Sequence, residues 1–189
     1  MKKNRKNIIL QSLASLLEER NLSKITTAAL AEKSGITEAA LYRHFPSKRS
    51  IYAELFSFCD NTVFNKCNDL KKEKISAKDK VKNAFIFFMI FIEKNKGFAR
   101  LLSREALSSN EQNVSENVNK FYERFELVFR QMLKEDEKNL VSQPGITAQL
   151  IITVLEGNIG RYIRSKFKDS PSNYIENVWT LLSLSIFKS

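Results

Sequence analysis

Turn-forming and chain-breaking residues are scarce in this sequence, which has only 5 glycines and 3 prolines among its 189 residues. A protein built from many short strands needs frequent turns, so this scarcity favours long helices over a β-sandwich or a barrel. Hydrophobic residues nevertheless make up 43% of the chain, enough to form a core and to exclude a wholly disordered protein. The composition therefore predicts an all-α globular protein.

Cysteine and histidine are scarcer still. Cys59 and Cys67 are the only cysteines of the sequence, and His44 is its only histidine. On one helix the two cysteines would lie about 12 Å apart along the axis, too far for a disulfide between them. His44 has no second histidine beside it and no cysteine at a useful spacing, so we expect no metal site and no other cofactor. The sequence also lacks a Ser/His/Asp, Cys/His or glycine-rich phosphate-binding arrangement, which argues against an enzyme.

Long hydrophobic runs are absent as well. The most apolar run, Ala84–Ile92, is far shorter than the roughly 20 residues that a membrane span needs. The basic N-terminus, MKKNRKNIIL, has neither the apolar region nor the cleavage site of a signal peptide. We therefore expect a cytoplasmic protein without a membrane span, in which Ala84–Ile92 belongs to a helix buried on all sides.

Positive charge is concentrated near the N-terminus. Residues 1–50 contain ten Lys/Arg and four Glu, a net charge of +6, whereas residues 51–189 contain 21 basic and 17 acidic residues, a net charge of +4. A basic segment attached to a nearly balanced body suggests that the N-terminal part binds a polyanion. A solvated charged face is the alternative interpretation of the same charges.

Periodicity and capping residues predict nine helices and no strand. Residues 1–50 would form a small DNA-binding domain and residues 51–189 a larger helical body. The predicted helices cover Lys3–Arg20, Thr27–Ser34, Glu38–Phe45, the segment after Ser47 to Lys72, the segment after Ser76 to Lys94, Phe98–Leu107, an amphipathic segment from Val114 to Met132, Thr147–Lys168 and Ser172–Phe187.

The segment ITTAALAEKSGITEAALYRHFPSKRS (25–50) predicts a helix-turn-helix. Thr26 or Thr27 caps one short helix, Gly35 ends it, and Thr37 caps a second helix that Pro46 prevents from continuing. Leu30, Ile36, Leu41 and Phe45 would supply its small core. Two short helices joined by a glycine-containing turn are typical of DNA-binding heads.

The residue types of this segment suit a duplex. Hydroxyls and free N–H groups at the helix starts can hold phosphates, and small residues let the second helix enter the major groove, where Arg43 would address guanine or a phosphate. Tyr42, His44 and Lys48 are assigned to phosphates, and Lys2, Lys3, Arg5 and Lys6 to a flexible basic arm, although they also suit an ordinary basic tail. The candidate DNA-binding residues are Lys3, Arg5, Thr26, Thr27, Thr37, Glu38, Ala39, Ala40, Tyr42, Arg43, His44 and Lys48.

The stretch ITTAALAEKSGITEAALYRHFPSK resembles the helix-turn-helix of the TetR family, with Tyr42, Phe45 and Lys48 at its typical positions. The resemblance continues through ILQSLASLLEE, EKNKGFARLLSREAL and EGNIGRYIRSKFKDSPSNYIENVW, which are similar to the nucleoid occlusion branch of that family. It implies a TetR-like fold, with a three-helix head and a helical dimerisation body. It also implies a dimer that binds palindromic double-stranded DNA at the nucleoid and, when DNA-bound, antagonises polymerisation of the division protein FtsZ.

The body should carry a dimer interface, because one recognition helix reads too little sequence. The last two helices are the expected interface, with Gly157 and Gly160 allowing close approach; an ordinary intrachain core is the alternative. The candidate interface residues are Ile151, Leu155, Tyr162, Ile163, Ile175, Trp179 and Leu182. The basic stretch RYIRSKFK (161–168) lies at a predicted helix C-terminus, where the helix dipole accounts for it.

A groove for a partner peptide is expected between the fourth and fifth helices, with Phe58, Lys66, Phe87, Lys94 and Asn95 as candidates. The basic members suit an acidic or C-terminal peptide. Relatives favour arginine in this region, so lysine here weakens the case for bidentate pairing with a carboxylate. Core packing is the alternative role for Phe87.

Two other functions compete with a division regulator. A ligand-responsive TetR-type repressor would need a closed apolar pocket, expected along Phe85–Ile92, and would release DNA when the ligand binds. An enzyme is the third possibility, against which the missing catalytic arrangements argue.

Overall fold

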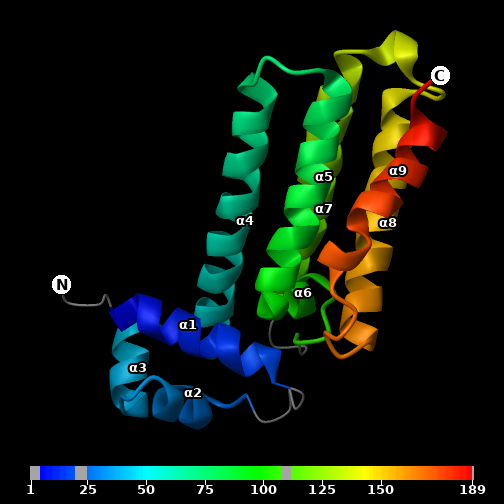
Figure 1. Cartoon of the computed structure of the whole chain (residues 1–189). Coiled ribbons are helices and arrows are strands. Elements are labelled where there is room, and N and C mark those ends of the chain that lie inside the picture. Colours follow the sequence, from blue (N-terminus) through cyan, green and yellow to red (C-terminus); the bar gives the residue numbers. More distant parts are fainter. Residues whose placement is uncertain (1–4, 20–24, 108–111, 189) are drawn as a thin grey trace. The chain divides into compact units, whose positions relative to one another are not determined.

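The structure, a computed structural model, describes residues 5–19, 25–107 and 112–188 (Figure 1). Within these ranges the chain forms nine α-helices and no β-strand beyond an isolated bridge between Leu140 and Phe187, which confirms the predicted all-α class. The helices are α1 (Arg5–Glu18), α2 (Thr27–Lys33), α3 (Glu38–His44), α4 (Lys48–Lys72), α5 (Ala77–Lys94), α6 (Lys96–Leu102), α7 (Gln112–Lys134), α8 (Pro144–Arg164) and α9 (Ile175–Ile186). Two 3-10 turns, η3 (Glu137–Asn139) and η4 (Pro171–Asn173), precede the last two helices.

Local capping chemistry explains why several helices begin where they do. The hydroxyl of Ser76 accepts a hydrogen bond from the backbone N–H of Asp79 at 3.0 Å and donates one to the carboxylate of Asp79 at 2.6 Å. Helix α8 begins with Pro144. Proline is tolerated in the first turn of a helix because a backbone N–H at that position would have no hydrogen-bond acceptor within the helix. The predicted start of this helix at Thr147 was therefore three residues late.

Two helices end earlier than predicted. Helix α6 ends at Leu102, where Ser103 caps it, rather than at Leu107. Helix α8 ends at Arg164 rather than Lys168, because Lys166 and Phe167 adopt left-handed backbone conformations with φ angles of 57° and 61°. No residue type in this stretch signals such a turn, since glycine usually occupies it.

Contacts divide the chain into two compact units. The first contains Met1–Asp60 and Asn95–Val118, and the second contains Asn61–Lys94 and Asn119–Ser189. Helix α6, which the sequence assigned to the body, thus packs with the head, and α4 contributes to both units. The division proposed after residue 50 separates two continuous segments, whereas each compact unit combines two segments that are separated in the sequence.

The core of the first unit is built on α1, which lies beside α2 and α3 (Figure 1). The predicted inner stripe of α1 is buried at Ile9, Leu13, Leu16 and Leu17. Of the predicted helix-turn-helix core, Leu30, Leu41 and Phe45 are buried and Ile36 is half-buried. The short helices α2 and α3 therefore share their hydrophobic core with α1.

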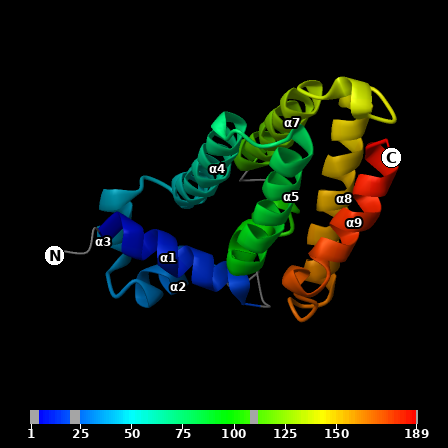
Figure 2. The same cartoon turned by 45° about the horizontal axis from the view of Figure 1, so that its top comes forward.

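Aromatic rings dominate the core of the second unit, where α5 lies beside α8 and α9 (Figure 2). The ring of Phe88 lies 4.7 Å from that of Phe125 in α7, and the ring of Phe85 lies 5.7 Å from the indole of Trp179. The apolar run in α5 is buried on one side, at Ala84, Phe85, Phe88, Met89 and Ile92, and half-buried at Ile86, Phe87, Ile90 and Phe91. None of the described helices is long and apolar enough to cross a membrane.

Candidate nucleic-acid interface

A tight turn joins α2 to α3. Helix α2 ends at Lys33 with Ser34 as its C-cap, and Gly35 takes a φ angle of +65° that most residues avoid. The N–H of Gly35 donates to the carbonyl of Glu32 at 3.0 Å, and that of Ile36 donates to the carbonyl of Ala31 at 3.1 Å. This pair of bonds is a Schellman motif, which satisfies the last carbonyls of α2 and redirects the chain into α3.

Of the two threonines predicted as alternatives for the start of α2, Thr26 is the cap, and Thr37 caps α3 as predicted. The hydroxyl of Thr26 accepts a bond from the N–H of Ala29 at 3.1 Å, and that of Thr37 accepts one from the N–H of Ala40 at 3.2 Å. A hydroxyl that accepts one bond can still donate another, so capping leaves these groups able to contact a phosphate. Thr27 is half-buried in the first turn of α2.

Helix α3 presents most of its surface outward. Leu41 is its one buried residue and anchors the helix to the core. Glu38, Ala39, Tyr42 and Arg43 are exposed, and Ala40 and His44 are half-buried. A short exposed helix with two alanines and one arginine has the size and polarity to enter a major groove.

The start of α4 adds cations beside α3. Ser47 and Ser50 cap the helix reciprocally, each accepting a bond from the other's N–H, at 3.1 Å and 3.2 Å. Lys48 is half-buried, with its ammonium 5.4 Å from the Tyr52 ring centroid. Arg49, the next residue, is exposed and was not among the predicted DNA-binding residues. Its position directly after Lys48 at the start of the helix could have identified it from the sequence.

The predicted basic arm is only partly within the described residues. Lys3 and Lys2 lie outside them. Arg5 and Lys6 belong to α1 instead of a flexible arm, and the Lys6 ammonium lies 5.4 Å from the ring centroid of Phe45. That correction follows from the helical periodicity of α1, which extends to Arg5.

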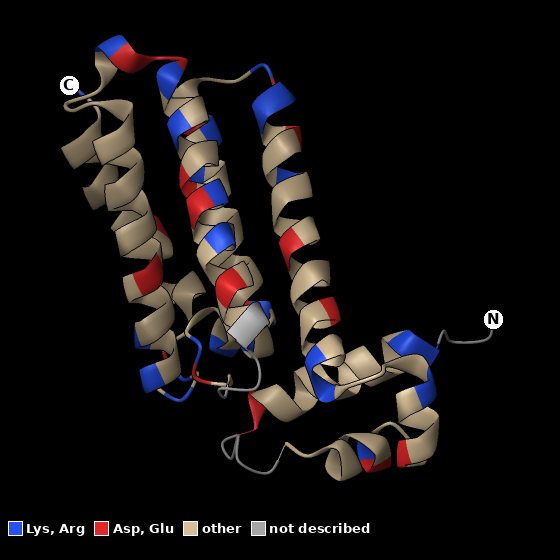
Figure 3. Cartoon of the chain, turned by 180° about the vertical axis from the view of Figure 1, so that it is seen from behind, with Lys and Arg blue, Asp and Glu red and all other residues tan. Residues whose placement is uncertain are grey.

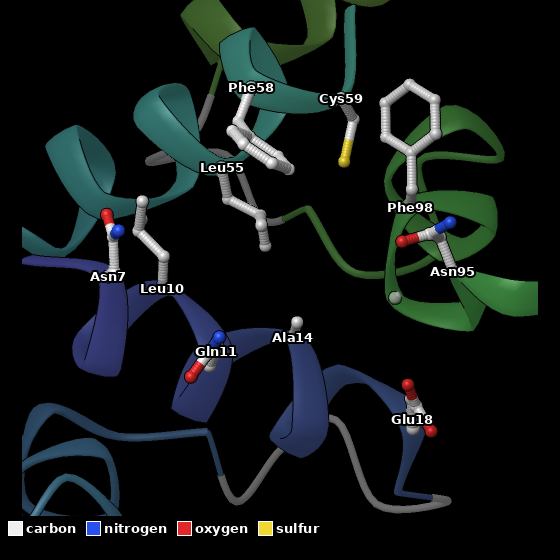
Figure 4. A pocket seen from close by; sticks show the side chains of 11 residues that line it. Asn7, Leu10, Gln11, Ala14, Glu18, Leu55, Phe58, Cys59, Asn95 and Phe98 are labelled. Carbon is white, nitrogen blue, oxygen red and sulfur yellow. The ribbon is translucent and has the colours of Figure 1, made fainter. Parts of the chain in front are cut away.

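The predicted partner-binding residues are divided between the two units. In the first, Phe58 and Asn95 line a pocket of about 220 Å³ whose wall also contains Leu10, Ala14 and Phe98 (Figure 4). Phe58 is 64% exposed, so its ring lies largely outside the core. In the second unit, Lys66 lies 4.0 Å from the Glu73 carboxylate, Phe87 packs 5.9 Å from the Phe91 ring, and Lys94 is exposed.

Most of the predicted dimer-interface side chains are instead part of the chain's own core. Ile151, Leu155, Tyr162, Ile175, Trp179 and Leu182 are buried in the single chain, and only Ile163 is half-buried. The outward apolar positions of the same helices are Ile146 and Leu150 in α8 and Leu181 and Leu184 in α9, which are 41–72% exposed. The helices were chosen for their apolar content, but the sequence did not reveal which side faces outward. Gly157 is exposed and Gly160 half-buried on α8.

Within the described ranges, no group of three or more His, Cys, Asp and Glu side chains is arranged to hold a metal ion. Cys59 and Cys67 are both buried, and burial raises the pKa of each thiol to about 12. Neither thiol is therefore an activated nucleophile.

Capped short helices, a glycine turn between them and an outward-facing second helix define a helix-turn-helix DNA-binding head. Comparison with known proteins agrees with this class. Residues 9–55 match the family described as bacterial regulatory proteins of the tetR family, and residues 77–186 match the SlmA-like family, described as a tetracyclin repressor-like C-terminal domain.

Curated relatives extend the match over nearly the whole chain. The nucleoid occlusion factor SlmA of Marinobacter nauticus is 34% identical over 190 residues, covering 98% of this chain and 97% of the relative. The nucleoid occlusion factor SlmA of Vibrio vulnificus is 35% identical with the same coverage. The chain therefore belongs to the SlmA-like branch of the TetR family of DNA-binding regulators.

Solved structures show the same fold at much lower identity. The fatty acid degradation regulator FadR from Bacillus halodurans superposes with a TM-score of 0.80 at 15% identity, covering 96% of each chain. NalD, a repressor of a multidrug efflux pump in Pseudomonas aeruginosa, superposes with a TM-score of 0.78 at 16% identity, covering 98% of each chain.

Proposed function

We propose that this protein is a nucleoid occlusion factor. It binds palindromic chromosomal DNA as a homodimer through α3 and, when DNA-bound, antagonises FtsZ polymerisation, so that the division septum does not form over the nucleoid. The observation that carries this proposal is the 34–35% identity, over nearly the full chain, to relatives named nucleoid occlusion factor SlmA. The head alone would support any DNA-binding regulator of this fold.

The exposed apolar side chains of α8 and α9 support the dimer. Ile146, Leu150, Leu181 and Leu184 lie outside the core, and burying them against a second copy would remove apolar surface from water. A two-fold symmetric pair presents two copies of α3, which matches a palindromic site. We therefore assign the interface to these four residues instead of the buried positions.

Phe58 is the central residue in our proposal for the partner contact. An aromatic ring that is 64% exposed offers an apolar anchor for an extended peptide, and Asn95 in the same pocket wall offers amide hydrogen bonds. Lys66, Phe87 and Lys94 are the further candidates, with the two lysines suited to an acidic segment. Substituting these residues one at a time tests whether they contact FtsZ.

The decisive experiment assembles purified FtsZ with GTP and measures sedimented polymer with and without this protein. A palindromic duplex selected from random DNA for binding to the protein is added to one series, and a scrambled duplex of equal length to another. We expect polymer to decrease only with the selected duplex. Phe58→Ala should abolish the decrease without weakening DNA binding, while Leu127→Ala, which removes an exposed apolar side chain from α7, should leave it intact.

A ligand-responsive repressor is the competing function. In the α5 region where its pocket was expected, Phe85, Phe88, Met89 and Ile92 are fully buried. The ring of Phe85 packs against Trp179 in α9, and the ring of Phe88 packs against Phe125 in α7. The pocket beside Phe58, at about 220 Å³, is smaller than the roughly 300–1,000 Å³ usual for small-molecule sites. Unaffected FtsZ polymer together with tight binding of the selected duplex would favour the repressor.

A further inference from the structure

The C-terminus of α8 carries a turn whose residues are unusual for its geometry. Beyond the cap residue Ser165, Lys166 donates its N–H to the carbonyl of Ile163 at 2.8 Å, and Phe167 donates to the carbonyl of Tyr162 at 3.0 Å. The ring of Phe167 packs 5.0 Å from that of Tyr162. These bonds and this apolar contact are the Schellman motif, in which glycine is the usual residue at the position of Lys166.

The same chain uses glycine where the motif recurs. At the end of α2, Gly35 adopts a φ angle of 65°, and at the end of α8, Lys166 adopts 57° with the same pair of backbone bonds. A side chain is strained in this conformation and glycine is not. The turn therefore does not need a lysine, and the sequence places a cation there at a cost in stability.

Lys166 belongs to a cluster of cations at this corner, which we call the α8 corner: Arg161, Arg164, Lys166 and Lys168. Figure 3 colours the Lys and Arg positions blue along the ribbon. All four are exposed, and Arg161 alone is paired, to Asp169 at 2.6 Å. The nearby carboxylate of Glu93 already accepts bonds from the N–H and hydroxyl of Ser172. Within the described part of the chain, no salt bridge reaches Arg164, Lys166 or Lys168.

The chemistry of the α8 corner favours one class of partner. None of the large exposed hydrophobic side chains lies in residues 161–168, so a protein partner would find no apolar anchor and a membrane no side chain to insert. Phosphate groups need no such anchor, because charge and counterion release supply the affinity. The helix dipole accounts for a cation near this end but not for the strained backbone of Lys166.

We propose that the α8 corner binds the phosphate backbone of duplex DNA, as a contact separate from the recognition helix. This inference rests on the proposed DNA-binding function and assigns a second DNA-contacting surface to it. The contact reads no base, so it strengthens binding to selected and scrambled duplexes alike.

The test compares Lys166→Gly with Lys134→Gln, which removes an exposed lysine from the end of α7. Duplex affinity is measured for the full-length protein by fluorescence anisotropy across a salt series, and Tm by calorimetry. We expect Lys166→Gly to raise Tm by roughly 2–4 °C by relieving backbone strain. The same variant should bind both duplexes roughly three- to tenfold more weakly at low salt. It should also reduce the slope of log affinity against log salt concentration by about one. Lys134→Gln should change neither the affinity nor this slope.

A higher Tm with unchanged affinity and salt slope would overturn the inference and leave Lys166 a helix cap alone. Loss confined to the selected duplex would also overturn it, because that pattern indicates an effect transmitted to α3. Lys168→Gln, which changes no strained backbone, should lower affinity for both duplexes without raising Tm. If the wild-type protein bound no duplex, the proposed DNA-binding function would fail together with this inference.

Discussion

Gly97 in α6 packs directly against the backbone of Ala14 in α1, so closely that a Cβ on Gly97 would lie 3.0 Å from the carbonyl oxygen of Ala14. It would also lie 3.1 Å from the Cβ of Leu17. Directly after the end of α1, the carbonyl of Glu19 accepts a hydrogen bond from the buried guanidinium of Arg100. Helix α6 is thereby held to the C-terminal half of α1, the helix on which the DNA-binding head is built.

Gly97→Ala should therefore destabilise the first unit. The obstructing atoms are a backbone carbonyl oxygen and a Cβ bonded directly to the backbone, and neither can rotate away. Relief therefore requires α1 and α6 to move apart, and we expect a loss of about 1–3 kcal/mol in the free energy of unfolding. Urea denaturation followed by circular dichroism measures it. Gly145→Ala is the matched control, since a Cβ there meets nothing within 4 Å and should be neutral or slightly stabilising. Equal stability of the two variants would contradict the close approach.

Charge placed on the exposed face of α9 should separate the proposed dimer. Leu181→Glu combined with Leu184→Glu alters side chains that are 69% and 72% exposed, so the monomer fold should survive. Analytical ultracentrifugation should then report a monomer that no longer binds the palindromic duplex tightly. Leu127→Glu, on the exposed face of α7, should remain dimeric, and a dimeric double variant would place the interface elsewhere.

Substitutions in the head should separate base recognition from phosphate contact. Arg43 is exposed on α3, and its loss should weaken binding to the selected duplex by about 1–3 kcal/mol if it pairs with guanine. Lys48→Ala should instead weaken binding to selected and scrambled duplexes equally and lower the salt slope by about one. Anisotropy titrations of both duplexes distinguish the two effects. Equal losses from both substitutions would assign Arg43 to phosphate.

The two buried thiols should make the free energy of unfolding depend on pH in the alkaline range. Burial raises the pKa of Cys59 and Cys67 from the ordinary value to about 12, so the unfolded chain loses these protons first as pH rises. The thiols' contribution is fully present below the unfolded pKa and is lost as pH rises toward about 12. At pH 8, a disulfide reagent should modify both cysteines rapidly in urea and only slowly in the native protein. Rapid native modification would show that these thiols are accessible.

The sequence alone determined the helical class and the helix-turn-helix, because both depend on local chemistry. Thr37 caps the helix that it was predicted to cap, and Thr26 is one of the two caps predicted for the helix before it. Gly35 takes the left-handed turn that only glycine adopts without strain. These interactions join residues three or four positions apart, so the pattern of residue types is sufficient to place them.

Only the tertiary structure decided which sides of the helices face outward and which distant segments meet. Leu182 is buried and its neighbours Leu181 and Leu184 are exposed, although all three are leucines, because each residue turns the helix by about 100° and packing alone selects the inner side. The bond from Arg100 to Glu19 joins residues 81 positions apart, and no local pattern signals it. The lysine in the α8 turn likewise became informative only through its backbone angle, which the surrounding packing imposes against the residue's own preference.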